Sequence, residues 1–441
     1  MSYGVIALLM FSGMMLLLLT GQRIFAVIGF VGATMALLLW GDGGIEMSFT
    51  AVMKLMKWYP LLTLPLFVFM GFMLAESKIA DDLYIMFHVW FGPVRGGLAI
   101  GTLLLMVVIS AINGLSVAGM AIGATIALPE LLRRGYDKVM VSGVIQAGST
   151  LGILLPPSVV LVLYGMIARQ PVGNLWMAGV FPGLLMATLF GLYIIIRCWL
   201  QPELGPPLPK EERDKYTLAD KLRLLRAGIL PLAIFLSMTG LFLAGITSLV
   251  ESSAVGVVGS LAAAAMRGKL SWRVLHETTK KTLGISCMFF WILMAAMCFG
   301  AVFDGLGAVK SIEWLFIGEW GLEPWMVIVL MQATFLLLGM FLDDTAMLVI
   351  VAPLFIPLAA MLGFDLVWYG VLYTITCQIA YLTPPFGYNL FLMRAMAPPE
   401  ITLPDIYRSV TPFVIIMLLT LVIIGVFPGI ATWLPNHIYS K

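Results

Sequence analysis

The stretches GSTLGILLPPS (residues 148–158) and CQIAYLTPPFG (residues 377–387) each place two consecutive prolines inside an otherwise apolar run. Proline lacks the backbone N–H that a helix needs, and its ring clashes with the carbonyl four residues earlier, so each pair is predicted to break a helix. Within a bilayer, broken backbone is tolerated only where protein buries it or water reaches it. We therefore expect the function of the protein to lie at these two breaks.

The composition indicates that both breaks lie in a membrane. Of the 441 residues, 61% are hydrophobic and 11% are charged, whereas soluble domains average about 45–50% and about 25%. This excludes a water-soluble enzyme, a disordered protein and a nucleic-acid-binding protein, and it predicts that the lipid bilayer is the solvent. The four cysteines have no paired spacing and the three histidines lie far apart, so we expect free thiols and no zinc or haem site.

Apolar runs long enough to cross a bilayer predict the membrane spans. They cover residues 3–20, 24–40, 57–75, 175–199, 228–245, 247–266, 282–302 and 409–433. The first run has neither a basic n-region nor a small-residue cleavage site, so we expect a span rather than a signal peptide. The zones 93–170 and 320–395 are also apolar, but Gly, Pro and polar residues interrupt them.

The two interrupted zones are related by an internal repeat with an offset of 228 residues. The matched pairs are Ser116 with Asp344, Ala118 with Ala346, Pro129 with Pro357, Gly135 with Gly363, Tyr136 with Phe364, Asp137 with Asp365, Leu154 with Leu382, Pro156 with Pro384 and Pro157 with Pro385. Prolines, glycines and aspartates that match in one register indicate a duplication. Duplicated halves with broken segments at matching positions are the best sequence indication of a secondary transporter's binding site.

Each copy is predicted to contain a re-entrant hairpin followed by a broken span. The segments are a hairpin at 93–132 with its tip at 113–116, a span at 138–168 broken near 152–158, a hairpin at 323–361 with its tip at 343–345, and a span at 366–393 broken near 380–385. An odd number of crossings separates the hairpins, so the second copy enters from the opposite side. We therefore predict an all-α polytopic membrane protein with two inverted repeats.

Positive charges predict the orientation, because cytoplasmic loops are enriched in Lys and Arg. Basic residues gather at the base of the first hairpin and in the loops 201–226 and 267–281, which the crossing count puts on one face. That face is expected to be cytoplasmic, so the N-terminus is expected outside, although Lys54 and Lys57 fall on the outer face. Two amphipathic stretches, 79–91 and 308–320, suit interfacial helices. These helices can be arms that link a moving domain to a static one, or they can be simple interfacial anchors. The residues fit both roles equally.

The breaks are predicted to free backbone carbonyls at membrane depth. The freed carbonyls are those of Gly152 and Ile153 in the first copy and of Ala380 and Tyr381 in the second, and Leu155 and Thr383 lie in the broken loops. Bare carbonyls are costly in a membrane, and Na⁺ fills such positions in secondary transporters. The hairpin tips can complete each shell with Asn113, Gly114, Leu115 and Ser116 in one copy and Leu342, Asp343, Asp344 and Thr345 in the other. The alternative is that the prolines only kink the helices and that Ser or Thr hydroxyls or water donate hydrogen bonds to the freed carbonyls. Two breaks in one register favour ion sites instead.

The half-helices that start after the breaks present free N–H groups and positive dipole ends, and Ser116 and Ser158 are candidate N-caps. Several such ends at one point make an anion site without a strongly basic residue, which predicts a substrate that carries a carboxylate. The expected substrate cavity consists of Ser149, Thr150, Ser158, Asp344, Thr345 and Gln378.

Two adjacent acids lie inside an apolar run, Asp343 and Asp344, and an acid within the membrane is a functional candidate by default. Neighbouring positions on a helix face different ways, so we expect only one of them, Asp343, to bind the ion. Glu251 is expected to stabilise the start of a span, and Arg169 and Arg394 to snorkel from the ends of the broken spans.

The run GSTLGILLPPSVVLVLYG, the N-G-x-S tip, ELLRRGYDK, the E-S-S-A-V-G run and LTPPFGYNLF together resemble the large membrane subunit of TRAP (tripartite ATP-independent periplasmic) transporters over nearly the whole chain. The resemblance implies an elevator-type, sodium-coupled importer of organic acids in the bacterial inner membrane. It also implies two partners, a small four-helix membrane subunit, expected here as a separate chain, and a periplasmic substrate-binding protein.

The resemblance further implies two sodium sites, which fall at Asn113, Leu115, Gly152, Leu155 and Pro157 and at Asp343, Ala380, Thr383 and Pro385. Asn113 stands where members of the family commonly have Ser, and its amide oxygen can still accept a cation. The expected domains are scaffold helices at 1–78, an arm at 79–92, a first transport half at 93–173, scaffold helices at 174–302, an arm at 303–320, a second transport half at 321–400 and a last scaffold helix at 401–441.

Two other classes of protein are alternatives to this one. A self-sufficient sodium–carboxylate symporter of the related fold would carry the same repeats, and it differs in needing no partner subunit. An intramembrane protease would need a Ser–His pair, an HExxH motif or two aspartates on separate helices, and the sequence has none of these arrangements.

Overall fold

The computed structural model describes residues 2–20, 22–76, 79–114, 116–213, 216–340, 344–384 and 387–439. Every regular element in these ranges is a helix, which confirms the predicted class. Six described helical segments are long and apolar enough to cross a membrane, at Tyr59–Glu76, Val172–Leu200, Leu218–Leu243, Leu249–Met266, Trp272–Gly305 and Leu403–Val426.

The first half of the chain runs from the N-terminus to a long helix that ends at residue 200. Its elements are α1 (Tyr3–Leu19), α2 (Ile24–Trp40), α3 (Asp42–Met56), η1 (Tyr59–Leu62), α4 (Thr63–Glu76), α5 (Ile79–Phe91), α6 (Gly97–Asn113), α7 (Ser116–Ile122), η2 (Gly123–Ala127), α8 (Leu128–Arg133), α9 (Lys138–Thr150), η3 (Leu151–Ile153), α10 (Val159–Ala168) and α11 (Val172–Leu200).

A polar connection and the second half of the chain follow. The connection contains η4 (Pro202–Leu204), α12 (Lys210–Arg213) and α13 (Leu218–Leu224). The second half contains α14 (Arg226–Leu243), α15 (Leu249–Met266), α16 (Trp272–Gly305), α17 (Ala308–Glu313), η5 (Trp314–Glu319), α18 (Pro324–Gly339), α19 (Asp344–Met361), α20 (Leu366–Leu382), α21 (Tyr388–Met396), α22 (Leu403–Val426) and α23 (Gly429–Tyr439).

Three helices differ from the predicted spans. Helix α16 starts at Trp272 rather than 282, because Ser271 caps it by accepting a hydrogen bond of 3.2 Å from the N–H of Val274. The predicted span 409–433 is wrong at both ends, since α22 begins at Leu403, directly after its N-cap Thr402, and ends at Val426, before Pro428. Helix α3 was not predicted, because its 15 residues are amphipathic rather than continuously apolar.

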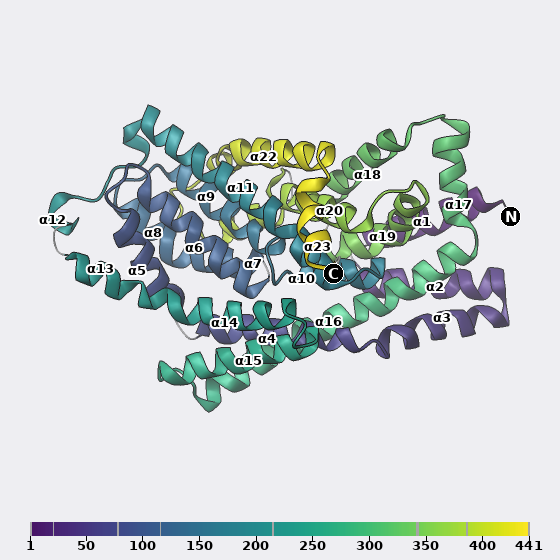
Figure 1. Cartoon of the computed structure of the whole chain (residues 1–441). Coiled ribbons are helices and arrows are strands. Elements are labelled where there is room, and N and C mark those ends of the chain that lie inside the picture. The colour runs from purple at the N-terminus through teal and green to yellow at the C-terminus, as the bar shows by residue number, and fades with distance from the viewer. Residues whose placement is uncertain are drawn as a thin grey trace.

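Figure 1 shows two layers of helices. The layer at the bottom of this view contains α2, α3, α4, α14, α15 and α16, which pack against one another. The layer above it contains α6–α11 and α18–α22. Packing within the lower layer is close: a Cβ added to Gly32 of α2 would lie 3.0 Å from the Cα of Phe299 in α16.

The upper layer contains two helical hairpins, each followed by an interrupted helix. The hairpins are α6–α7 and α18–α19, and the interrupted helices are α9–η3–α10 and α20–α21. The first interruption covers 154–158, as predicted, but α20 stays helical through Leu382, so the second interruption begins later than the expected residue 380. These elements lie in the positions along the chain that the repeat predicts.

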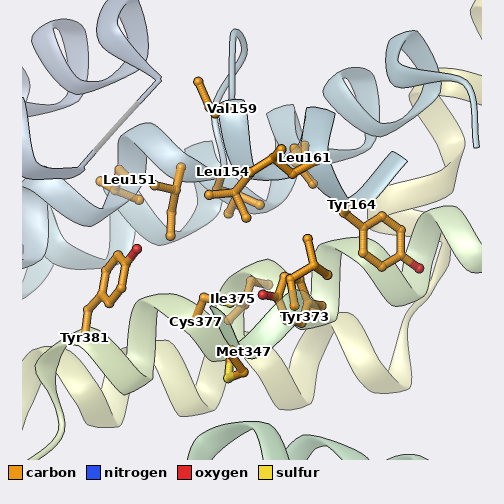
Figure 2. Packing of buried hydrophobic residues seen from close by; sticks show 14 of the residues in the cluster. Leu151, Leu154, Val159, Leu161, Tyr164, Met347, Tyr373, Ile375, Cys377 and Tyr381 are labelled. Carbon is orange, nitrogen blue, oxygen red and sulfur yellow. The ribbon is translucent and has the colours of Figure 1, made fainter. Parts of the chain in front are cut away.

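The two interrupted helices lie side by side, and apolar side chains fill the space between them (Figure 2). Leu151, Leu154 and Leu161 come from the first helix and face the side of the second that carries Ile375. The ring of Tyr164 stacks on that of Tyr373 at 6.0 Å between centroids. Every residue from Met140 to Ile153, in α9 and η3, is buried. The same holds for every residue from Val367 to Leu382 in α20. The first break therefore lies in the interior of the protein, since residues 154–158 are buried as well, whereas at the second break Thr383 is half-buried and Pro384 is exposed.

Candidate functional site

The tip of the first hairpin touches the first break. Gly114 ends α6 in the left-handed conformation, with a φ of 66°, which favours glycine. A Cβ at this position would lie 2.5 Å from the carbonyl oxygen of Pro157. The N–H of Val159 donates a hydrogen bond of 3.4 Å to the carbonyl of Gly114. The structure thus brings together two segments that were predicted to form one site.

Gly152 lies against the same hairpin. A Cβ on Gly152 would lie 2.4 Å from the backbone carbonyl of Ser110 in α6, so only glycine allows the two chains to come this close. Pro156 cannot donate to the carbonyl of Gly152, and that carbonyl has no other donor in the described part of the chain.

The carbonyl of Ile153, which Pro157 was expected to leave bare, is instead satisfied locally. It accepts a hydrogen bond from the hydroxyl of Ser158. The same hydroxyl oxygen accepts a bond of 3.1 Å from the N–H of Leu161, which confirms Ser158 as the N-cap of α10. At this break a serine hydroxyl therefore satisfies one of the two freed carbonyls, that of Ile153.

The second break is also partly satisfied by its own residues. The N–H of Thr383 donates to the carbonyl of Ala380 at 3.1 Å, so the expectation that Pro384 leaves this carbonyl bare is wrong. The Thr383 carbonyl accepts a bond of 3.1 Å from Gly387, and its hydroxyl donates to the Ile379 carbonyl at 2.6 Å. Each carbonyl oxygen keeps a second lone pair, so both can still accept a cation.

Several predicted site residues cannot be placed. Leu115, Leu342, Asp343 and Pro385 lie outside the described residues. The side chains of Asn113, Asp344 and Thr345 also lie outside the described set, although their backbone belongs to α6 and α19. The second ion site and the choice between the two aspartates therefore stay predictions.

A buried polar cluster joins the first hairpin to both interrupted helices. The Nδ2 of Asn389 in α21 lies within hydrogen-bond distance of three groups, at 3.1 Å from the Ser116 hydroxyl, 3.1 Å from the Ser149 hydroxyl and 3.3 Å from the Gln146 carbonyl. All four residues are buried. Ser116 is the first residue of α7 rather than its N-cap, and its hydroxyl faces this cluster.

Sequence reasoning missed Asn389, although it lies only four residues after Pro385 in the quoted run LTPPFGYNLF. The signal in the sequence was an amide side chain beside the break, because a buried amide needs hydrogen-bond partners.

The described residues of the predicted substrate cavity face protein rather than open space. Ser149, Thr150, Ser158 and Gln378 are fully buried. The Oε1 atom of Gln378 has no hydrogen-bond donor in the described part of the chain, and the same holds for Oε1 of Gln146. An unpaired buried acceptor costs about 1–3 kcal/mol. These two oxygens can therefore accept from a ligand.

Two sizeable cavities lie between the layers. These cavities of about 880 and 890 Å³ are bordered by α3 on one side and by the end of α10 on the other, and both are lined by Lys54, Arg169 and Met297. None of the described site residues lines either cavity. Arg169, which was expected to snorkel, instead faces this space from the C-cap of α10, with a φ of 54°.

A hairpin tip that meets a broken helix in a buried centre, as the first hairpin does here, is typical of a secondary transporter. The chain belongs to the family described as the DctM component of tripartite ATP-independent periplasmic transporters, whose model matches residues 11–430. This confirms the resemblance that the sequence motifs carry.

Curated relatives are similar over most of their length. The C4-dicarboxylate TRAP transporter large permease protein DctM of Pseudomonas aeruginosa is 30% identical over 415 residues, which is 93% of each chain. The ectoine/5-hydroxyectoine TRAP transporter large permease protein UehC of Ruegeria pomeroyi is 27% identical, over 99% of this chain and 98% of its own. The sialic acid TRAP transporter permease protein SiaT of Haemophilus influenzae is 28% identical, over 86% of this chain and 60% of its own. These relatives are permeases, so the chain is a multi-pass transport protein and not an enzyme.

A solved structure has the same fold. The YdaH transporter of Alcanivorax borkumensis aligns with a TM-score of 0.66 at 15% identity, over 89% of this chain and 90% of its own.

Proposed function

We propose that the chain is the large membrane subunit of a sodium-coupled importer of an organic acid, working with a separate small membrane subunit and a periplasmic substrate-binding protein. The observation that carries the proposal is the contact between Gly114 and the broken helix at Pro157, beside a Gly152 carbonyl that has no donor among the described residues. The partner proteins follow from membership of a tripartite family.

Sodium is the ion that best fits the chemistry of the centre. In the described residues the groups available there are carbonyl, amide and hydroxyl oxygens, and no group of three His, Cys, Asp or Glu side chains gathers to hold a metal. Such neutral oxygens at an unwound segment suit a monovalent hard cation. The Gly152 carbonyl, which has no donor among the described residues, supports this choice.

An organic acid is the substrate that fits the helix ends. Helices α7 and α10 both begin at the centre, and their N-terminal N–H groups favour a negative charge. The relatives named for C4-dicarboxylate and sialic acid are in line with a carboxylate. The centre itself contributes hydroxyls and amides rather than a buried basic side chain among its described members.

The cavities suggest which parts of the protein move. They separate α3 and α16 from the densely buried unit of α10, α19 and α20, and loosely packed boundaries are where domains shift. Helix α5 is connected to the end of α15 by an ion pair of Asp82 with Arg267. It is connected to α13 by a hydrogen bond of 3.1 Å from Trp90 to the Lys221 carbonyl. We therefore assign α5 the role of an arm that holds the moving unit, as in an elevator mechanism with inverted repeats.

The orientation follows from charge. The base of the first hairpin carries Arg133 and Arg134, and Arg134 pairs with Glu212 of the basic connection at 2.7 Å. We place this face in the cytoplasm and the N-terminus in the periplasm of a bacterial inner membrane.

The test is uptake of a radiolabelled organic acid into proteoliposomes that hold all three components. We expect uptake with an inward sodium gradient and only background uptake when choline replaces sodium. Equal uptake in both conditions would defeat the coupling. Full uptake by the chain without its two partners would favour a self-sufficient symporter.

A further inference from the structure

A third cavity, of about 680 Å³, lies away from the centre between α5, α13, the start of α14 and the end of α15. Its charged lining residues are Asp82, Asp220, Arg223, Arg226 and Arg267. Both acids already have partners: Asp82 pairs with Arg267, and Asp220 accepts hydrogen bonds of 3.0 and 2.7 Å from the N–H and hydroxyl of Thr217.

Two guanidinium groups are in no ion pair in the described structure, although the Asp220 carboxylate attracts that of Arg223. Arg223 and Arg226 are both exposed and form no ion pair with the described residues. They are three residues apart, across a junction at Leu225 whose backbone is itself helical, and residues three apart on a helix are neighbours. Two adjacent guanidinium groups offer the paired N–H donors that a phosphate binds best.

An exposed apolar stripe leads away from these arginines. Its members are Leu222, Leu225, Ile229, Leu232 and Leu236, which are 53%, 42%, 60%, 56% and 55% exposed. Spacings of three and four residues put them on one face of α13–α14. Arg226 lies four residues after Leu222 and three before Ile229, so it belongs to the same face.

We propose that this cavity binds the phosphate of an anionic phospholipid, with an acyl chain along the stripe of α14. A basic pocket at the end of a membrane-spanning helix is the arrangement that recognises anionic headgroups, and here charge and apolar surface are continuous. Because α5 forms one wall through Asp82 and Ile85, the bound lipid joins the arm to α13–α15.

The experiment uses the full-length chain, purified in detergent, delipidated and offered phosphatidylglycerol or phosphatidylcholine with the same acyl chains. Native mass spectrometry measures the lipid retained by the wild type, by the double variant Arg223→Gln/Arg226→Gln, and by the control Arg273→Gln/Lys280→Gln, which removes two exposed basic residues of α16 outside the cavity. We expect phosphatidylglycerol to bind about tenfold more weakly to the first variant and normally to the control.

Several outcomes would overturn the proposal. They are equal retention of the two lipids by the wild type, an equal loss in both variants, and displacement of phosphatidylglycerol by millimolar inorganic phosphate, which would make the cavity a site for free phosphate. A photoactivatable phosphatidylglycerol should label α14 in the wild type, and labelling elsewhere would also count against it. A thermal melt of each variant shows that it is folded, which keeps a loss of binding interpretable.

Discussion

Gln378 donates a hydrogen bond of 2.8 Å through its Nε2 to the carbonyl oxygen of Thr150, and the two residues are 228 positions apart. This separation equals the offset of the internal repeat, so the bond joins two equivalent positions of the two copies. Equivalent positions can touch only where they lie beside the axis that relates the copies. The bond is therefore in line with the predicted twofold relation between the copies, which stays a prediction.

Gln378→Leu is predicted to impair transport more than stability. The change removes the bond to Thr150 but also removes an unpaired buried Oε1, so the effects on the free energy of unfolding largely cancel. Sodium-dependent uptake should fall at least about tenfold if that oxygen serves the ion or the substrate.

The control for this change is Gln332→Leu, which removes another buried glutamine that accepts a bond of 2.6 Å from Thr376 outside the centre. Uptake by this variant should stay normal. An equal loss of uptake in the two variants would show that Gln378 has no special role.

Gly114→Ala is predicted to abolish uptake. A methyl group would strike the Pro157 carbonyl at 2.5 Å and would force a left-handed φ on a residue with a Cβ, so the hairpin tip must withdraw from the break. The conformational penalty alone is about 1 kcal/mol. Uptake and the melting temperature of the purified chain are the measurements.

Gly135→Ala separates the two causes. Gly135 has a φ of 78° but open space around its Cβ position, so the variant carries the conformational penalty without the clash. We expect a similar small loss of melting temperature with uptake retained. Normal uptake by Gly114→Ala would remove the tip contact from the mechanism.

Asn389→Ala is predicted to destabilise the protein and to disconnect the two halves at the centre. The Nδ2 group can donate two of the three hydrogen bonds within its reach, to the Ser116 and Ser149 hydroxyls and the Gln146 carbonyl, so the change leaves two buried acceptors without this donor, at a cost of about 2–3 kcal/mol. The melting temperature should drop by several degrees. Asn436→Ala, at an exposed position in α23, should leave the melting temperature unchanged.

Stability is predicted to fall in mild acid because of His88. Burial, together with Arg134, lowers the pKa of this histidine from 6.5 to about 4, and its Nδ1 is buried without a partner in the described structure. Between pH 6.5 and 4 the unfolded chain binds a proton that the folded chain does not, so the free energy of unfolding decreases as the pH falls through this window.

The variant His88→Phe should flatten the dependence of melting temperature on pH between 6.5 and 4. His276→Phe, at an exposed position of α16, should keep the wild-type dependence. A wild-type slope in His88→Phe would assign the acid sensitivity to other groups.

The sequence was informative wherever a rule depends on neighbouring residues. Proline pairs break helices by local sterics, so the break at 154–158 could be predicted, as could Gly114 as the turn of the hairpin. The capping boundaries of α16 and α22 also follow local rules, but a search for continuous apolar runs does not detect them.

Long-range relationships were harder to predict. The role of Asn389 depends on contact with Ser116, which is 273 residues away, and no local pattern encodes that proximity. Arg169 was expected to reach the membrane surface, but the α3 helix, which the apolar-run template missed, creates the cavities that it faces. The satisfied carbonyls of Ile153 and Ala380 depend on side-chain and backbone geometry inside the break.

The bond between the Val159 N–H and the Gly114 carbonyl limits how the gate can work. Pulling the hairpin tip away from α10 would strand a donor and an acceptor in a dry interior, where each unpaired group is costly. We therefore expect the tip and the start of α10 to move together during transport, and we expect the flexibility that transport needs to lie in another part of the chain.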